Sequence, residues 1–250
     1  MDNQRLSDCL GTDFGRLREV AADADPGAAV PTCPDWAMAD LLRHVAEVYL
    51  HKTECMRLGR DPDPWPPEGL AGEPPLELLD RSYAALTAEF AARRPEEHAF
   101  TWYGPDQSVG FWIRRMAQET VIHRVDAELA AGSQIAAIPD DLATDGIDEL
   151  LAIFVQYGTA NWPEYFPELA ALTGDRAVSV VTPQRSWLLR LTPTGARVAE
   201  PGPDHALVTV EGPAQEVLLS LWNRGGQGVT VTGDDETAAL LHQVVATNTQ

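Results

Sequence analysis

The spacing of apolar residues changes character near residue 175 of the chain. Before that point, apolar side chains recur every three or four residues, which is the period of an amphipathic α-helix. After it, short segments alternate apolar and polar side chains, as half-buried β-strands do. We therefore predict an α+β protein, in which a helical bundle (residues 1–170) precedes a smaller α+β domain (residues 175–250).

The helical part contains regular stripes separated by proline- and glycine-rich turns. Ser108 is a predicted N-cap of the longest helix, and Gly132 is a residue of the type that follows a helix end. The predicted helices cover residues 6–21, 38–59, 75–90, 108–132 and 147–154. Four or five antiparallel helices of this kind form a bundle, and bundles place their sites between facing helices.

The second part alternates predicted strands with two helices. The expected strands are residues 177–182, 186–191, 205–212 and 228–233. The expected helices cover residues 214–222 and 236–245, and either Asp234 or Asp235 can cap the latter. No internal repeat is visible in the sequence.

The composition narrows the classes of partner. The 250 residues include 18 Lys and Arg against 38 Asp and Glu, a formal charge of −20. Nucleic-acid binding requires clustered cations, and the chain has no basic run, so we expect no nucleic-acid partner. No apolar run reaches the ~18–20 residues of a membrane span, and the first residues lack the pattern of a signal peptide, so we expect no membrane partner.

The cysteines and the lysine are few. Cys9, Cys33 and Cys55 have no metal-like spacing and are an odd number, which favours a reducing, cytoplasmic location over a disulfide framework. We expect Cys9 in the core, Cys33 to be structural and Cys55 at a helix surface or boundary. Lys52 is the only lysine, and the sequence gives no sign of a desolvated pocket around it.

One group of side chains on the predicted helices suits a metal ion. Glu119 and His123 lie four residues apart, so they face the same side of the longest helix, and Asp126 follows on that side. His44, on the flank of another helix, is the candidate third ligand. Two histidines and one carboxylate leave a fourth position open, as catalytic zinc sites do. Asp126 is either a further ligand or an acceptor for an imidazole N–H.

Spacing alone leaves other interpretations open. A glutamate and a histidine four residues apart are commonly a solvated pair on a helix surface. His44 by itself is equally compatible with a hydrogen-bonded residue at the edge of the core.

Two segments carry a resemblance to a known family. VPTCPDWAMADLLRHVAEVY and, about eighty residues later, RRMAQETVIHRVDAELAAG are similar to the mycothiol-dependent maleylpyruvate isomerase family. The resemblance implies a DinB-like four-helix bundle followed by a small α+β domain. It also implies a divalent metal, usually zinc, held by His44, Glu119 and His123. Members commonly have Gly-Trp and then Ser or Thr before the second helix; here Asp35 precedes Trp36, and we expect Asp35 to cap that helix.

The family resemblance extends to the second domain. The segment LLSLWNRGG is similar to the family's Leu-Trp-x-Arg segment, so Arg224 is the implied catalytic arginine. A guanidinium can hold a substrate carboxylate with two hydrogen bonds. A helix-end arginine that binds the last carbonyls would explain the residue equally well.

The resemblance implies an enzyme in which the thiolate of mycothiol adds to a small electrophile, as in maleylpyruvate cis–trans isomerisation. A mycothiol S-transferase is an alternative, and so is a hydrolase with a zinc-bound water and Asp126 or Glu47 as general base. A third alternative is a non-enzymatic bundle that binds a ligand. Because the chain is acidic, an anionic substrate would need local positive charge, for which Arg224, Arg43 and Arg124 are candidates.

Overall fold

The computed structural model describes residues 1–199 and 206–249, and the chain divides into two compact units, Met1–Ala136 and Ala137–Gln250. The change of pattern at 170–175 therefore does not coincide with the division between the units. Periodicity marks where helices give way to strands, whereas the division depends on which elements pack together.

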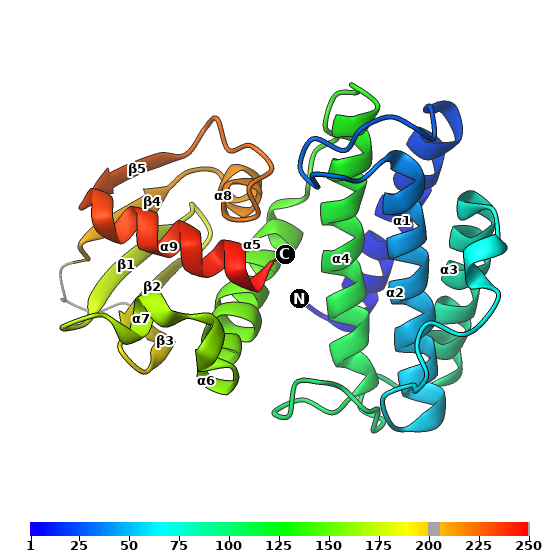
Figure 1. Ribbon diagram of the computed structural model, residues 1–250, viewed down its shortest axis with the longest axis horizontal. Helices are drawn as coiled ribbons and strands as arrows, with labels where there is room; N and C mark the ends of the chain where they lie inside the picture. The colour runs from blue at the N-terminus through cyan, green and yellow to red at the C-terminus, as the bar shows by residue number, and fades with distance from the viewer. Residues whose placement is uncertain (200–205, 250) are drawn as a thin grey trace. The chain divides into compact units, whose positions relative to one another are not determined.

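The first unit is a bundle of four helices that run side by side (Figure 1). They are α1 (Asn3–Asp23), α2 (Met38–Leu58), α3 (Pro75–Ala92) and α4 (Val109–Ala130), with a short 3₁₀ helix η1 (Leu70–Gly72) before α3. Helix α1 packs along α4, and α2 packs along α3 and also contacts α4. The fold class predicted from the sequence is confirmed.

Local chemistry fixes the ends of these helices. The Ser108 hydroxyl accepts a hydrogen bond from the Phe111 N–H at the start of α4, and Gly132 adopts the left-handed conformation just after its end (φ 63°). The expected Asp35 cap is wrong. Asp35 has a left-handed backbone (φ 73°), and Ala37 precedes α2 with its own N–H donated to the Asp40 carboxylate at 2.9 Å.

The bundle core contains aromatic and charged groups as well as aliphatic ones. Phe14 stacks on Tyr83, and the Tyr49 hydroxyl shares a 2.6 Å hydrogen bond with the Thr120 hydroxyl, which joins α2 to α4. The buried Arg124 guanidinium donates to Asp13 of α1 at 3.0 Å and to Glu128 at 2.7 Å. Buried ion pairs are costly to break, so this network fixes α1 against α4.

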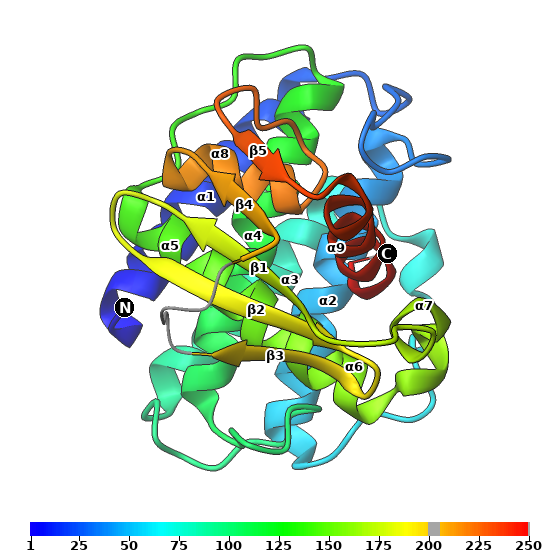
Figure 2. The same cartoon turned by 90° about the vertical axis from the view of Figure 1, so that its left-hand side faces the viewer.

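The second unit is built on a five-stranded mixed sheet (Figure 2). Its strands are β1 (Arg176–Val181), β2 (Ser186–Thr192), β3 (Gly195–Ala199), β4 (Val208–Glu211) and β5 (Thr230–Gly233), in the order β3-β2-β1-β4-β5. Only the central pair β1–β4 is parallel. The other elements are α5 (Asp140–Glu149), the π-helical segment η2 (Leu150–Tyr157), α6 (Gly158–Asn161), η3 (Pro163–Tyr165), α7 (Pro167–Ala170), α8 (Ala214–Leu221) and α9 (Asp235–Asn248).

The helix expected at 147–154 belongs to the second unit and not to the bundle. Helix α5 continues through η2 and α6, and its side chains hold the sheet. Thr159 accepts a hydrogen bond from the Ala196 N–H at 2.8 Å, and Gln156 accepts one from the Val198 N–H at 2.7 Å. One edge of strand β3 pairs with β2. Side chains of this helix bind the N–H groups on its other edge.

The strands differ from expectation in two places. Strand β3 was not predicted, because Gly195–Ala199 has only one fully buried side chain and lacks an apolar alternation. The expected strand 205–212 begins at His205, which lies outside the described residues, and its described part is β4. The Asp234 carboxylate caps α9 by accepting from the Thr237 N–H at 2.9 Å.

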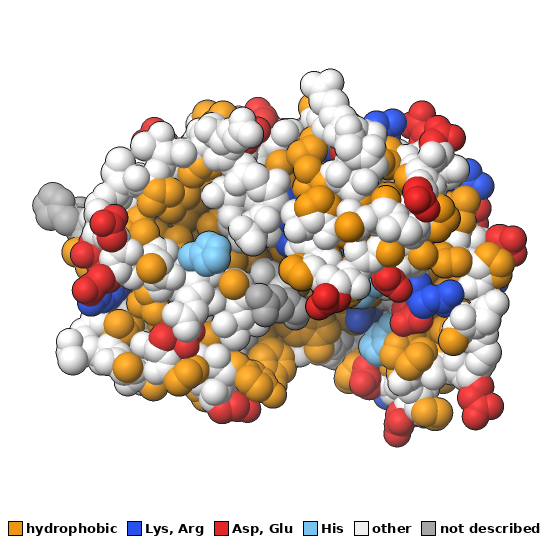
Figure 3. All heavy atoms as spheres, turned by 45° about the horizontal axis from the view of Figure 1, so that its top comes forward, with side chains coloured by type: hydrophobic (Ala, Val, Ile, Leu, Met, Phe, Trp, Pro, Cys, Tyr) orange, Lys and Arg blue, Asp and Glu red, His pale blue; other side chains and the backbone are white. Residues whose placement is uncertain are grey.

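Two surface properties bear on partners. In the described ranges 1–199 and 206–249, no helix is both long enough and apolar enough to span a membrane. Acidic side chains are scattered over the face shown in Figure 3 rather than gathered in one patch.

Candidate metal centre

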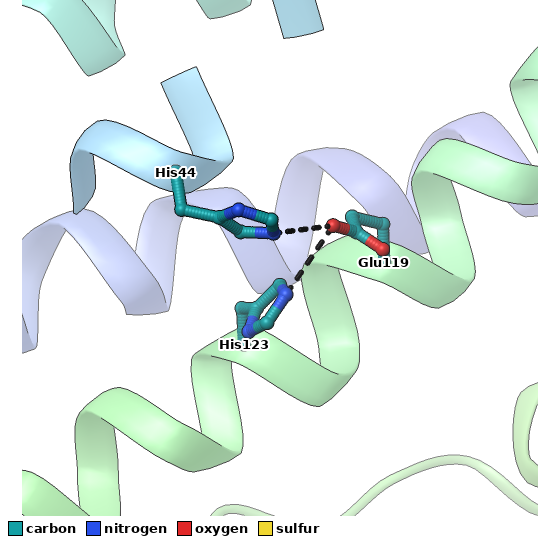
Figure 4. Close-up of side chains that lie close together, drawn as sticks. All are labelled: His44, Glu119 and His123. Carbon is teal, nitrogen blue, oxygen red and sulfur yellow. Dashed lines mark ion pairs between the residues drawn. The ribbon is translucent and has the colours of Figure 1, made fainter. Parts of the chain in front are cut away.

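Helices α2 and α4 bring the three predicted ligands together (Figure 4). His44 comes from α2, and Glu119 and His123 lie one turn apart on α4. The Oε1 atom of Glu119 is 3.3 Å from Nε2 of His44 and 3.2 Å from Nε2 of His123. One ligand atom from each residue lies within 4.8 Å of the other two.

The donor set fits a divalent metal ion. Two ligands on a tetrahedral zinc ion, at bond lengths of 2.0–2.2 Å, lie roughly 3.3–3.5 Å apart. The separations of 3.3 and 3.2 Å from Oε1 of Glu119 are close to that value. Imidazole nitrogens and a carboxylate oxygen are also donors that zinc accepts. His44 keeps 38% of its side chain exposed, so the group is open on the α2 side.

Each α4 ligand is held from behind by a second side chain. The Nδ1 atom of His123 lies 2.9 Å from Oδ2 of Asp126, whose side chain is fully buried. Oδ1 of Asp126 accepts a 2.5 Å hydrogen bond from the Thr32 hydroxyl. The second oxygen of Glu119 accepts a 2.6 Å hydrogen bond from Arg115. These contacts leave Oε1 of Glu119 and Nε2 of His123 facing the same point.

The segment before α2 forms one wall of the group. Trp36 lies over both imidazoles, with ring centroids 4.8 Å from His44 and 6.5 Å from His123. The same segment supplies Thr32 and Cys33 to Asp126, the latter with Sγ 3.9 Å from Oδ2. A bridge between Ala29 and Ala37 closes this segment into a loop.

In the metal-free protein, each charged side chain of this group favours the charged form of its neighbours. Burial alone would raise the pKa of Glu119, but the charge of His123, hydrogen bonds from His123 and His44, and the charge of Arg115 hold that pKa well below its usual range. Burial opposes protonation of His123, yet Glu119 and Asp126 outweigh it and raise the pKa of His123 to about 9. A metal ion must therefore displace a proton from His123 near neutral pH.

Two of the three predicted arginines hold parts of the bundle together. Arg43 donates to the carbonyl oxygens of Leu70 and Glu73, both at 2.8 Å, and so holds the loop before α3. Arg124 belongs to the buried network with Asp13. Arg224 is in the second unit, where its Nη1 donates to the Trp222 carbonyl at 2.6 Å. That contact matches the helix-end interpretation of Arg224.

A second cluster lies further along α2, around His51, Cys55 and Asp61, whose ligand atoms also lie within 4.8 Å of one another. Nζ of Lys52 is 3.1 Å from Nδ1 of His51, the ring nitrogen that also lies 3.5 Å from Sγ of Cys55, so Nδ1 already has a partner. Two expectations are corrected here. Cys55 is buried, at 1% exposure, and Lys52 does lie in a desolvated environment. Lys52 lies against the Trp112 ring of α4, a direction that sequence position alone did not reveal.

Sequence reasoning missed Arg115 and Trp36. Arg115 precedes Glu119 by four residues on the same helix, a spacing that could have identified it. Trp36 precedes α2 and reaches the site only because the loop 29–37 folds back, for which the sequence carries no local signal.

Comparisons with known proteins agree with this architecture. Residues 8–128 match the mycothiol maleylpyruvate isomerase N-terminal domain, and residues 141–241 match the MDMPI C-terminal domain. These bounds flank the division between the two units.

Two solved structures resemble the whole chain. A crystal structure of the mycothiol-dependent maleylpyruvate isomerase is 18% identical, with a TM-score of 0.61 over 94% of this chain and 95% of that chain. A histidine-to-alanine mutant of that enzyme is 17% identical, with a TM-score of 0.63 over the same shares. No curated protein matches the chain. The two domain models, taken together, cover most of the sequence, so the chain belongs to the mycothiol maleylpyruvate isomerase family.

Proposed function

We propose that the protein is a divalent-metal enzyme, most simply a zinc enzyme, that uses mycothiol to isomerise a small unsaturated acid such as maleylpyruvate. The observation that carries the proposal is the convergence of two imidazoles on one carboxylate oxygen, at 3.2 and 3.3 Å. Membership of the family supports the thiol and the substrate class. A divalent ion held by His44, Glu119 and His123 would act as a Lewis acid that lowers the pKa of a thiol bound beside it.

The chain's own residues would prepare that site. Asp126 fixes the ring of His123 by accepting from Nδ1, so Nε2 is the nitrogen that would bind a metal once its proton is displaced. Arg115 holds the far oxygen of Glu119, so that Oε1 is directed between the imidazoles. Trp36 covers one side of both rings and restricts access by water. A drier site strengthens every electrostatic interaction within it.

Asp126 is therefore proposed as a positioning residue. Its two oxygens already face His123 and Thr32, and its side chain is fully buried. A general base must reach the proton that it removes, which disfavours the hydrolase mechanism through Asp126. For Arg224 we propose the electrostatic role that the family resemblance implies, namely binding of a substrate carboxylate.

Metal titration tests the first part of the proposal. Metal-free protein should bind one zinc ion per chain, and the His44→Ala/His123→Ala double variant should lose that binding. His242→Ala is a matched control, because His242 is an exposed histidine on α9. Undiminished stoichiometric uptake by the double variant would show that the metal assignment is wrong.

Turnover tests the second part. Zinc-loaded protein should convert maleylpyruvate to its trans isomer only when mycothiol is present. A stable mycothiol adduct without isomerisation would instead identify the S-transferase. Hydrolysis of an ester or amide without any thiol would favour the hydrolase. A folded protein with no affinity for divalent metals would favour the alternative of a non-enzymatic, ligand-binding bundle.

A further inference from the structure

The single lysine of the chain has an unusual setting. Lys52 lies on α2 eight residues after His44, a rise of about 12 Å along the helix. Its side chain is half-buried, and its Nζ atom lies 5.2 Å from the centroid of the Trp112 ring on α4. This position is separate from the three candidate metal ligands.

The amine of Lys52 begins a chain of three polar groups. Its Nζ atom is 3.1 Å from Nδ1 of His51, the neighbouring residue. On the other side of that ring, Nε2 lies 3.4 Å from Oδ1 of Asp61. The tautomer with its proton on Nε2 accepts from Lys52 and faces the Asp61 carboxylate with its N–H. The Trp65 ring packs perpendicular to the imidazole, with the two ring centroids 4.8 Å apart.

This arrangement is that of an activated nucleophile. Catalytic nucleophiles are recognised by a base within hydrogen-bonding distance and a third group that orients the base. Here the amine is the nucleophile, His51 is the base and Asp61 orients the imidazole. Cys55, with Sγ 3.5 Å from Nδ1 of His51, is the competing nucleophile, but it is buried. Burial raises the pKa of the Cys55 thiol to about 11, so Cys55 is unreactive near neutral pH.

The charges around Lys52 come from both helices and the following loop. Burial lowers the pKa of the Lys52 amine, and the nearby Arg115 of α4 lowers it further. Cys55, Glu119 and Asp61 act in the opposite direction without cancelling the effect. Burial, and the charge that Lys52 carries when it is protonated, lower the pKa of His51 to about 4, so its imidazole is neutral near pH 7. The base is thus in the form that accepts a proton.

We infer that Lys52 is a reactive amine that forms Schiff bases with small carbonyl compounds, with His51 as the proton acceptor. The Nζ lone pair forms a bond to the carbonyl carbon, and one Nζ proton passes to Nδ1 of His51. That proton and then the second Nζ proton pass to the former carbonyl oxygen, which leaves as water, and a neutral C=N bond remains. The reaction needs no oxidant, no reductant and no metal ion. It goes beyond the proposed function, which uses other side chains.

Reductive trapping tests this inference on the full-length, metal-free chain. The protein is incubated at pH 7 with glyoxylate and cyanoborohydride, and the peptide that contains Lys52 is quantified by mass spectrometry. The same reaction in guanidinium chloride gives the rate for the unfolded chain. The chain has one other amine, at Met1, which serves as an internal reference. A parallel reaction with acetaldehyde shows whether the carboxylate of glyoxylate assists.

We expect Lys52 to be labelled several times faster in the folded protein than in the unfolded chain, with either aldehyde. His51→Gln should bring the folded rate down to the unfolded rate or below it. Asp61→Asn should lower it by a smaller factor, and this variant is a safe folding control because the Asp61 side chain is 69% exposed. Lys52→Arg should leave labelling only at Met1.

The inference is overturned if Lys52 in the folded protein reacts no faster than in the unfolded chain. It is also overturned if folded His51→Gln and Asp61→Asn both label as fast as the wild type, since His51 would then have no part in the reaction.

Discussion

The metal-free protein should lose stability as the pH rises from about 6.5 to 9. The pKa of His123 is 6.5 in an unfolded chain and about 9 in the folded protein, because Glu119 and Asp126 favour its charged form. A group with a raised pKa stabilises the folded state fully below its unfolded pKa, and this stabilisation is lost as the pH passes the folded pKa. A tenfold change in a proton equilibrium corresponds to about 1.4 kcal/mol, so His123 contributes about 3 kcal/mol at pH 6.

Guanidinium denaturation with a chelator present measures the contribution of His123 to the free energy of unfolding. The difference in unfolding free energy between wild type and His123→Gln should change by about 3 kcal/mol between pH 6 and pH 10. The wild type should lose stability relative to the variant as the pH rises. With excess zinc the trend should reverse, because a metal that displaces the His123 proton binds more tightly at higher pH.

A difference between the two proteins that stays constant from pH 6 to pH 10 would refute this reasoning. So would a wild type that gains stability relative to His123→Gln over that range. Either result would mean that Glu119 and Asp126 do not act on His123 as their distances of 3.2 and 2.9 Å indicate.

Three further substitutions have definite expected results. Asp126→Asn should weaken zinc binding by about 10–100-fold in a competition titration, since it removes the acceptor for Nδ1 of His123. Ser108→Ala should lower the unfolding free energy by about 1 kcal/mol through loss of the α4 cap. Gly233→Ala should cost about 1–3 kcal/mol and lower Tm, because its φ of 117° disfavours a side chain and the new Cβ would overlap the Leu207 carbonyl oxygen.

Much of the fold follows from local sequence chemistry. Caps such as Ser108 and Asp234 place helix starts correctly, because a side-chain oxygen satisfies an N–H that has no other partner. The assignment of the helix at 147–154 to the bundle failed for a different reason. Apolar periodicity shows that a helix has a buried face, but it does not say which element covers that face. Here the partner is a sheet formed later in the chain, whose edge strand contacts Gln156.

The site was predictable where it depends on helical spacing. Glu119 and His123 face the same direction because they are four residues apart, and the flank position of His44 on its helix made it the candidate third ligand, which the family resemblance also implied. Trp36 and Thr32 could not be found in this way, since their loop reaches α4 only through the folded arrangement. Lys52 was misjudged for the same reason. Its desolvation comes from α4 residues about sixty positions later, such as Trp112.

The distribution of the proposed functional residues between the two units has an evolutionary consequence. His44, Glu119 and His123, together with Thr32, Arg115 and Asp126 behind them, all lie in Met1–Ala136, whereas Arg224 lies in Ala137–Gln250. On the roles proposed above, a mutation in the second unit would alter substrate preference without touching any metal ligand. Within such a lineage, the capacity to hold the ion and the choice of substrate could diverge at independent rates. Descendants could inherit the same ion-binding apparatus and act on different acids.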